Sequence, residues 1–271
     1  MFRASSKVLV SAFALVTVVS AQDSILSTLS TTCVSALKGL LVAPEAQCLN
    51  AGAFLSIAAS GNIDVPSIAT KWLTGLCATG SCSTASLTTI VQNVTAGCAQ
   101  DVKTAFNIDI SDPSVILPYV EQYYPSVRQI ACLKDDSANT LCVPQTLTNL
   151  QNIIGPLGTD DLNMDTILAD AQKIAASDYK NLACTSCAKQ AYSVAAKVFP
   201  DPSLLASVNG SITDTCGASF TDGQNVTTVS QTAVNGQFEV KTTSRAVAGF
   251  SPITTAGAIL VAISSAFTLL V

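Results

Sequence analysis

The amino-acid sequence predicts an all-α fold, in which disulfides staple a helical body and a loosely structured Ser/Thr-rich stalk follows it. Apolar residues recur at helical spacing through most of residues 22–216. Ten cysteines, an even number, all fall within this stretch. Between Ser211 and Ser244, 12 of the 34 residues are Ser or Thr, which is typical of a stalk rather than of a packed core.

The first 21 residues have the layout of a secretory signal peptide. Arg3 and Lys7 supply a positive start, and residues 8–19 form an apolar stretch without charge. The small residues that end at Ala21 suit signal peptidase, and the apolar stretch is too short to span a membrane. We therefore expect residues 1–21 to be removed as the chain enters the secretory route.

Residues 245–271 have the layout of a signal that attaches a glycosylphosphatidylinositol (GPI) lipid. A spacer separates small residues from a charge-free apolar run that begins at Ala256 and reaches the last residue. A spacer of about 8–12 residues places the lipid on Ser244, with Ala246 and Ala248 as alternatives. A buried C-terminal helix is the other interpretation of this run. The export signal at the opposite end favours the anchor, because GPI attachment requires a chain that has entered the secretory route.

Between these ends, periodic apolar residues predict a succession of helices. Pro44 ends the first, Pro66 opens the third at its first turn, and Pro118 and Pro125 disturb the fifth. The expected helical segments are residues 24–41, 45–59, 66–76, 83–106, 114–133, 144–154, 164–176, 186–199 and 202–208. Similar cysteine-containing units suggest two related halves, about 22–110 and 111–216, but their spacings differ too much to prove a repeat.

The predicted stalk, residues 217–244, contains one hairpin signal. Asn235-Gly236 lies between residues 227–234 and 237–243, two stretches that suit β-strands. A two-stranded ribbon alone is marginally stable in water. We therefore expect a stalk with only a local tendency to form a β-hairpin.

The ten cysteines predict five structural disulfides. They are Cys33, Cys48, Cys77, Cys82, Cys98, Cys132, Cys142, Cys184, Cys187 and Cys216. The chain contains no histidine, and an oxidising compartment removes the thiolates that zinc needs, so we predict no metal site and no cofactor. Cys184 and Cys187 have the spacing of a redox motif, but no strand–helix pattern of the thioredoxin type surrounds them. We expect each to be bridged to a distant cysteine or to the other.

Charge and composition exclude several functions. Residues 22–244 carry all 18 acidic residues but 10 of the 13 Lys and Arg, a formal charge of 10 − 18 = −8. Nucleic-acid binding needs clustered basic residues, so we expect no nucleic-acid partner. The lack of histidine removes the usual base that activates serine and cysteine nucleophiles, so we assign no catalytic residue.

Two acidic pairs and a tyrosine-rich stretch are the weak candidates for carbohydrate chemistry. A glycosidase needs two carboxylates across a cleft, whereas neighbours such as Asp135-Asp136 and Asp160-Asp161 more often cap turns. The tyrosines of residues 118–125 are able to stack on sugars, but tyrosines on a kinked helix are more often half-buried packing residues.

Three sequons predict N-linked glycans and therefore surface positions. They begin at Asn93, Asn209 and Asn225. Asn93 falls within an expected helix, so its glycan would mark the outward face of that helix.

The body resembles the cysteine-rich, helical, GPI-anchored surface proteins that fungi, basidiomycetes especially, carry in expanded sets. The resemblance is carried by the unit Trp72-Leu, Cys77, Cys82, Cys98 and by Leu182-Ala-Cys-Thr-Ser-Cys-Ala-Lys-Gln-Ala-Tyr192, and it covers roughly residues 33–216. It implies location better than activity, because the biochemistry of these proteins is largely unassigned. The cysteine spacing departs from that of the eight-cysteine CFEM haem-binding domains, so no haem site is carried over.

Three functions remain open at this point. The first is a structural or interaction protein on the outer face of the plasma membrane or in the cell wall, with wall polysaccharide as a partner. The second is a helical module that binds a lipid, sterol or other apolar small molecule. The third is an enzyme that modifies wall polysaccharide. A closed apolar cavity would favour the second, facing carboxylates the third, and neither of these the first.

Overall fold

The structure is a computed structural model that describes residues 29–54, 64–156, 169–170, 172–174, 176–177, 179–198 and 202–240. It is mostly helical and held by five disulfides, so the predicted all-α, disulfide-stapled class is confirmed. The predicted signal peptide, the lipidation candidates Ser244, Ala246 and Ala248, and the rest of the apolar tail lie outside the described residues. Of the helices in the described ranges, none has the length and apolarity needed to cross a membrane.

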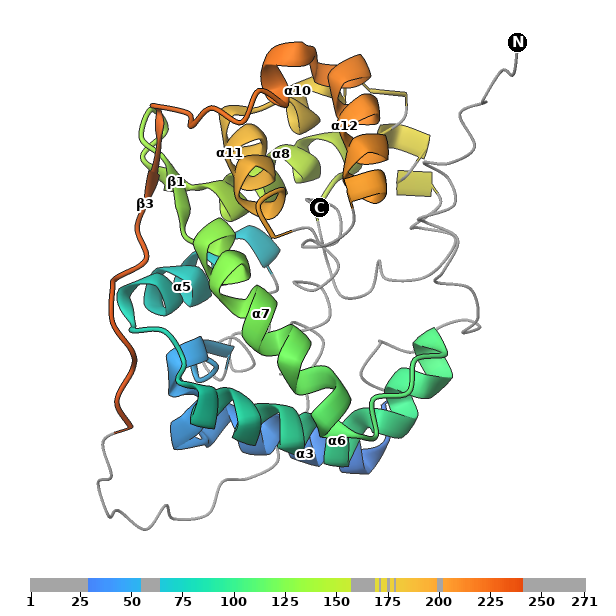
Figure 1. The fold of residues 1–271 in the computed structure, drawn as a ribbon, viewed down its shortest axis with the longest axis vertical. Helices are drawn as coiled ribbons and strands as arrows, with labels where there is room; N and C mark the ends of the chain where they lie inside the picture. The colour runs from blue at the N-terminus through green and yellow to red at the C-terminus, as the bar shows by residue number, and fades with distance from the viewer. Residues whose placement is uncertain are drawn as a thin grey trace.

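The helices form two groups joined by one long helix (Figure 1). The first group is α3 (Thr31–Val42), η1 (Pro44–Leu49), α5 (Val65–Ala78) and α6 (Thr84–Phe106). The second group is α8 (Cys142–Ile154), α10 (Lys180–Ala183), α11 (Ser186–Ala195) and α12 (Pro202–Cys216), followed by η2 (Ala218–Phe220). The joining helix, α7 (Pro113–Ala131), packs on α6 at one end and on α11 at the other. The helix α7 therefore contacts both groups.

Several helices begin where a side chain caps the first free backbone N–H groups. Ser30 accepts from the N–H of Cys33 before α3, and Ser83 accepts from that of Ser86 before α6. Thr185 does the same before α11, where the N–H of Ala188 is the donor. The expected helix 83–106 is reproduced almost residue for residue as α6, because its cap and its apolar period agree.

The structure corrects one expectation about the helices and, for residues 114–133, decides between a helix and a broken helix. The segment expected as a helix over residues 45–59 begins as the short 3₁₀-helix η1, which Asn50 ends in a left-handed conformation (φ 51°). The expected disturbance of residues 114–133 does not break the helix, because Pro118 and Pro125 both lie inside α7. Each proline removes one backbone donor, and packing at both ends of α7 offsets that loss.

A small antiparallel sheet, which the sequence did not predict, follows α7. Within the described residues it has three strands in the order β2 (Thr140–Leu141), β1 (Leu133–Asp135) and β3 (Val229–Gln231). Asn139 adopts a left-handed conformation in the turn between β1 and β2 (φ 55°). Lys134 pairs with Leu141 on one side and with Ser230 on the other, so β3 returns from far along the chain to lie beside β1.

All ten cysteines are paired, as the sequence predicts. The bridges are Cys33–Cys98, Cys48–Cys82, Cys77–Cys132, Cys142–Cys187 and Cys184–Cys216. Cys184 and Cys187 are therefore joined to different distant partners rather than to each other. Each bridge closes a loop of 32 to 65 residues, and loops of this size are expected to contribute about 3–4 kcal/mol each in the chain-entropy description.

Two neighbouring cysteines have a similar bonding pattern in each group. In the first, Cys77 in the last turn of α5 bonds to Cys132 later in the chain, and Cys82 just before α6 bonds to Cys48 earlier in the chain. In the second, Cys184 and Cys187 do the same around α10 and α11. Cys33–Cys98 has no counterpart in the second group. The Cys77–Cys132 bridge also joins the first half to the second, so a relation between the two halves stays a prediction.

The apolar core is continuous along α5 and α7. Leu73 is fully buried beside the Cys77–Cys132 bridge, and Val143 and Leu147 of α8 cover the same cluster. Phe54 is also fully buried and packs against Trp72, with ring centroids 5.3 Å apart. The core therefore joins the two helical groups rather than dividing them.

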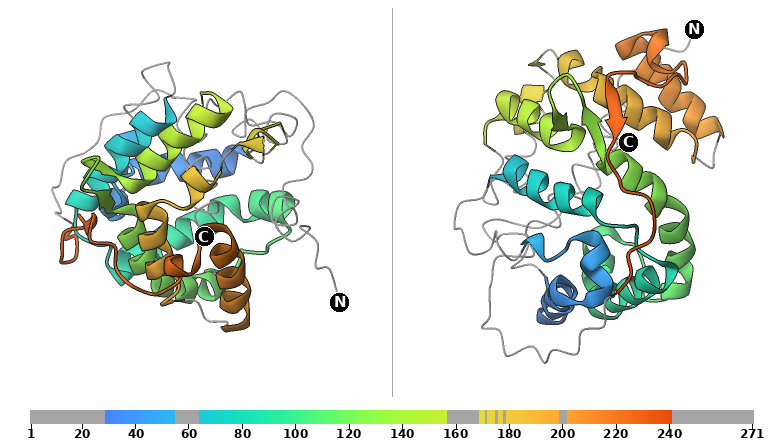
Figure 2. Two further views of the ribbon diagram at one scale, coloured as in Figure 1. Left: turned by 90° about the horizontal axis from the view of Figure 1, so that it is seen from above. Right: turned by 90° about the vertical axis from the view of Figure 1, so that its left-hand side faces the viewer.

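In the part of residues 217–244 that the structure describes, the predicted stalk has little regular secondary structure, but it lies against the body instead of forming a hairpin. Residues 225–238, hereafter the strap, run along the body from the second group to the first, as the orange ribbon in Figure 1 and the right view of Figure 2 shows. The strap pairs with β1 through β3, and Gln237 pairs with Ser81 in a parallel bridge. Asn235-Gly236 does not turn a hairpin, because the body supplies partners that a ribbon in water would lack.

Candidate functional site

A groove of about 710 Å³ lies where the strap crosses α7 and α11. The start of α6 closes one end, and β1 lies beneath the strap. Of its 19 lining residues, 12 are polar or charged, so the groove is an open surface of mixed polarity rather than a closed apolar cavity. Its volume falls within the range of about 300–1,000 Å³ that is usual for small-molecule sites.

The strap forms one wall of the groove with alternate residues. Those that line it are Val229, Gln231, Ala233, Asn235 and Gln237, the period of two expected for an extended chain. The intervening residues attach the strap to the body. Thr232 donates its N–H to the carbonyl of Cys132 at 3.0 Å, and Val234 donates to that of Cys77 at 2.9 Å.

Arg128 of α7 lies in the opposite wall and is only 7% exposed. It is the one arginine between residues 22 and 244. Its Nη2 donates to the carbonyl oxygens of Thr79 and Val234, which links α5, α7 and the strap. Its Nε–H finds no hydrogen-bond partner in the described part of the chain. Both acceptors are neutral carbonyls, so a buried positive charge stands at this wall without a carboxylate in ion-pair contact among the described residues.

Tyr124 marks the end of the groove that faces α6. It lies one turn before Arg128, and its hydroxyl accepts from the N–H of Cys82 at 2.9 Å. Burial raises the pKa of the Tyr124 hydroxyl above its usual value of 10, although the Cys82 hydrogen bond and the charge of Arg128 act in the opposite direction. The hydroxyl therefore stays protonated at neutral pH and retains a proton to donate.

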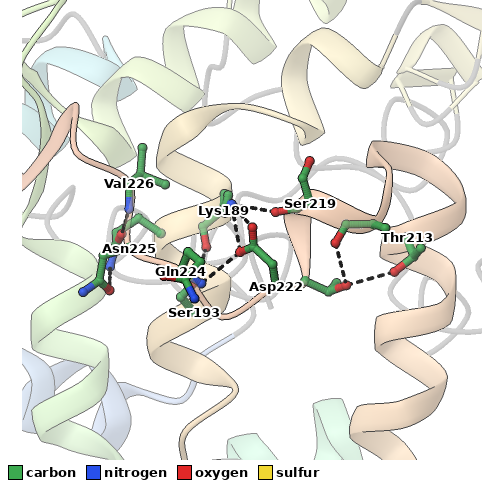
Figure 3. Close-up of polar contacts among 11 residues, drawn as sticks. Lys189, Ser193, Thr213, Ser219, Asp222, Gln224, Asn225 and Val226 are labelled. Carbon is green, nitrogen blue, oxygen red and sulfur yellow. Dashed lines mark hydrogen bonds and ion pairs between the residues drawn. The ribbon is translucent and has the colours of Figure 1, made fainter.

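The far rim of the groove is formed by Gln190 of α11 and by the first residues of the strap. Gln190 is 9% exposed, and its Oε1 accepts from the N–H of Val226 at 2.8 Å. Its Nε2 donates to Oδ1 of Asn225 at 3.4 Å. The oxygen and the nitrogen of the Gln190 amide thus both hold the start of the strap at the groove, as Figure 3 shows in part.

An ion pair between Lys189 and Asp222 holds the residues just before the strap against α11 (Figure 3). Lys189 Nζ lies 2.9 Å from Oδ1 of Asp222 and donates to the carbonyl of Ser219 at 2.6 Å. Asp222 also accepts from the N–H of Gln224 at 2.9 Å. This backbone bond, followed by that from Lys189, lowers the pKa of the Asp222 carboxyl below its usual 3.8. The rim is therefore held in place by hydrogen bonds and an ion pair.

The charged residues of the groove oppose the charge of the body. Arg128 and Lys197 are positive, and Glu121 is the negative lining residue. The groove thus has a formal excess of one positive charge, whereas residues 22–244 carry −8. With one carboxylate in its lining, this groove lacks the facing acidic pair that glycoside hydrolysis requires.

The three predicted glycan sites lie in different environments. Asn93 is exposed on α6, and its sequon residue Thr95 is buried with its hydroxyl donated to the carbonyl of Gln92. Asn209 on α12 is half-buried and accepts a hydrogen bond from the hydroxyl of Tyr192. Asn225 is exposed at the groove rim. Their glycosylation stays a prediction.

The acidic pair Asp135-Asp136 belongs to the β1–β2 turn and not to a cleft. Asp135 accepts from the N–H of Ser137 and from Nε2 of Gln145, and the latter bond is the largest cause of its lowered pKa. Asp136 accepts from the hydroxyl of Ser230 at 2.7 Å, which fastens the strap. The second pair, residues 160–161, lies outside the described residues.

The tyrosine-rich stretch does not form one aromatic surface. Tyr119 is 59% exposed on α7, whereas Tyr124 is half-buried and lines the groove. Sequence reasoning singled out these tyrosines but missed Arg128, the strap and Gln190. The available signal was the solitary arginine of the body. An arginine in the last turn of a helix is ordinarily explained by the helix dipole, so the sequence alone did not mark it.

Comparison of the chain with protein-family models, with curated protein sequences and with solved structures gives no match.

Proposed function

We propose that this protein is an extracellular protein of the outer plasma-membrane face or cell wall, held by a GPI lipid, whose body has a structural or binding role. The observation that carries the proposal is the pairing of all ten cysteines in five bridges. Disulfides at this density are typical of oxidising compartments outside the cytosol. The two terminal signals supply the route and the anchor.

The groove supports a binding role over a hydrolytic one. It is lined mostly by polar side chains, and Glu121 is the carboxylate among them. A polar lining also suits a wall polysaccharide better than a lipid or sterol. An apolar ligand would cover the amide side chains of the groove without offering them hydrogen-bond partners, which would weaken the binding of that ligand.

The strap brings the proposed anchor close to the body. Phe238 packs on the cluster of Cys48, Cys82 and Leu87, and its N–H donates to the carbonyl of Ser81 at 2.8 Å. From Val240 to Ser244 the chain spans at most about 14 Å, at about 3.3–3.6 Å per residue. A lipid on Ser244 would therefore hold the helical body near the membrane instead of raising it on a long stalk.

The anchor is tested by expressing the full chain in a eukaryotic secretory host. Phosphatidylinositol-specific phospholipase C is expected to release the wild-type protein from intact cells. Replacing Leu260 and Val261 by Asp should abolish attachment and send the chain into the medium or into retention, because the apolar run no longer acts as an attachment signal. A matched control replaces Ile108 and Val115, which are 54% and 55% exposed on the body, by Asp.

The control pair should stay at the surface and remain sensitive to the phospholipase. If the tail variant stays surface-bound like the wild type, the tail is not the anchor and the proposal fails.

A further inference from the structure

We propose that the groove binds an acidic oligosaccharide, with Arg128 receiving a uronic-acid carboxylate and the surrounding amides receiving sugar hydroxyls. This inference deepens the binding role proposed above and depends on it. It does not depend on the anchor, because every residue that lines the groove belongs to the described part of the chain.

The groove is locally positive in an otherwise acidic body. Arg128 and Lys197 outnumber Glu121 among the lining residues, whereas acidic residues outnumber basic ones 18 to 10 over residues 22–244. A concave surface with the opposite sign to the rest of the molecule concentrates anions there. An anionic ligand is therefore drawn to the groove and repelled by the surface around it.

The guanidinium of Arg128 has its geometry fixed but its charge uncompensated. Its bonds to the carbonyls of Thr79 and Val234 hold it in place, and Nε–H is left over. A buried cation with only neutral acceptors gains more from a carboxylate than an exposed one, because water competes less for it. A ligand carboxylate that reaches this wall supplies the missing negative charge.

The amide side chains of the groove suit the hydroxyl groups of a sugar. Gln129, Asn235 and Gln237 line the groove, and each amide offers donors and an acceptor, as a sugar hydroxyl does. Pro125 lacks an N–H, so the carbonyl of Glu121 loses its usual helical donor at the same wall. The groove therefore presents both donors and acceptors to a ligand.

Other occupants fit less well. A peptide that adds as a strand needs free backbone groups on the strap, but the N–H of Ala233 is taken by Oε1 of Gln231, and those of Thr232 and Val234 are bonded to the body. An apolar molecule would leave the guanidinium and the amides unpaired. Neither objection applies to a polyhydroxylated acid.

The test measures binding of a galacturonic-acid tetrasaccharide to the purified full-length protein by calorimetry. The uncharged control is the methyl ester of the same tetrasaccharide. We expect the acid to bind at least about tenfold more tightly than the ester, since a charge-assisted bond to arginine is replaced by a neutral one. Binding should also weaken with added salt.

Charge changes of opposite direction make the test independent of folding. Lys197→Gln is expected to weaken binding about two- to fivefold, and Glu121→Gln to strengthen it by a similar factor, which is the size of an exposed charge contact. Lys71→Gln is the matched control, because Lys71 is an exposed lysine on α5 outside the groove, and it should change nothing. Arg128→Gln should reduce binding more than tenfold.

A glycan on Asn225 would stand at the rim, so each measurement is repeated with Thr227→Ala, which removes the sequon and keeps Asn225. The inference is overturned if the ester binds as well as the acid, if neither binds in both backgrounds, or if Glu121→Gln fails to strengthen binding. These measurements are made on protein in solution, whereas the anchor is tested by phospholipase release from cells. A failure of the groove proposal is therefore distinguishable from a failure of the anchor.

Discussion

Gly97→Ala is predicted to destabilise the fold, against the ordinary preference of helices for alanine. Gly97 lies in the middle of α6, where alanine is worth about 1 kcal/mol over glycine from helix propensity alone. A Cβ at this position would stand 2.3 Å from the Cβ of Ala36 on α3. Carbon atoms in contact are usually about 3.5–4.0 Å apart, so the helices would need to separate by more than about 1 Å.

The Cys33–Cys98 bridge opposes that separation. It joins α3 and α6 one residue from Gly97, with its Cα atoms 4.4 Å apart. Overpacking of a tightly held contact costs about 1–3 kcal/mol, so after the gain in helix propensity the variant should be up to about 2 kcal/mol less stable than the wild type.

Gly39→Ala is the matched control for this prediction. Gly39 is a helical glycine of α3, and a Cβ there meets nothing within 4 Å. Guanidinium chloride titration with the disulfides intact should show it about 0.5–1 kcal/mol more stable than the wild type. The difference between the variants isolates the cost of the contact. If Gly97→Ala gains stability as Gly39→Ala does, the close approach of α3 and α6 is not a feature of the folded protein.

Three further outcomes are expected. Mass mapping of non-reduced peptides should link Cys187 to Cys142, and a peptide joining Cys187 to Cys184 would contradict the connectivity. Asp222→Asn should be less stable than wild type at neutral pH. The difference should close as the pH falls below about 3.8, because a carboxyl with a lowered pKa stabilises the fold only while ionised. Asn93→Gln should remove one glycan without changing the unfolding midpoint, since Asn93 is exposed; a folding defect would place this side chain inside the body.

Local chemistry was sufficient for the class of the fold and for several of its boundaries. The Ser83 cap and the apolar period of residues 83–106 both depend on neighbours three or four residues apart, so α6 could be predicted closely. An even cysteine count in a chain expected to be exported predicted five bridges, because thiols in an oxidising compartment are usually paired. The partners themselves depend on which helix ends meet, and only the folded chain brings Cys184 to Cys216 and Cys187 to Cys142.

The tertiary structure alone decided the candidate site. Residues 229–238 were expected to belong to a loose segment because residues 211–244 are rich in Ser and Thr, but β1 and Ser81 offer them backbone partners from more than 90 residues away. Arg128 is an ordinary last-turn arginine in sequence and becomes a buried cation once the strap covers it. Local periodicity carries no information about contacts at such separation. The helices could therefore be predicted from the sequence, whereas the groove between them could not.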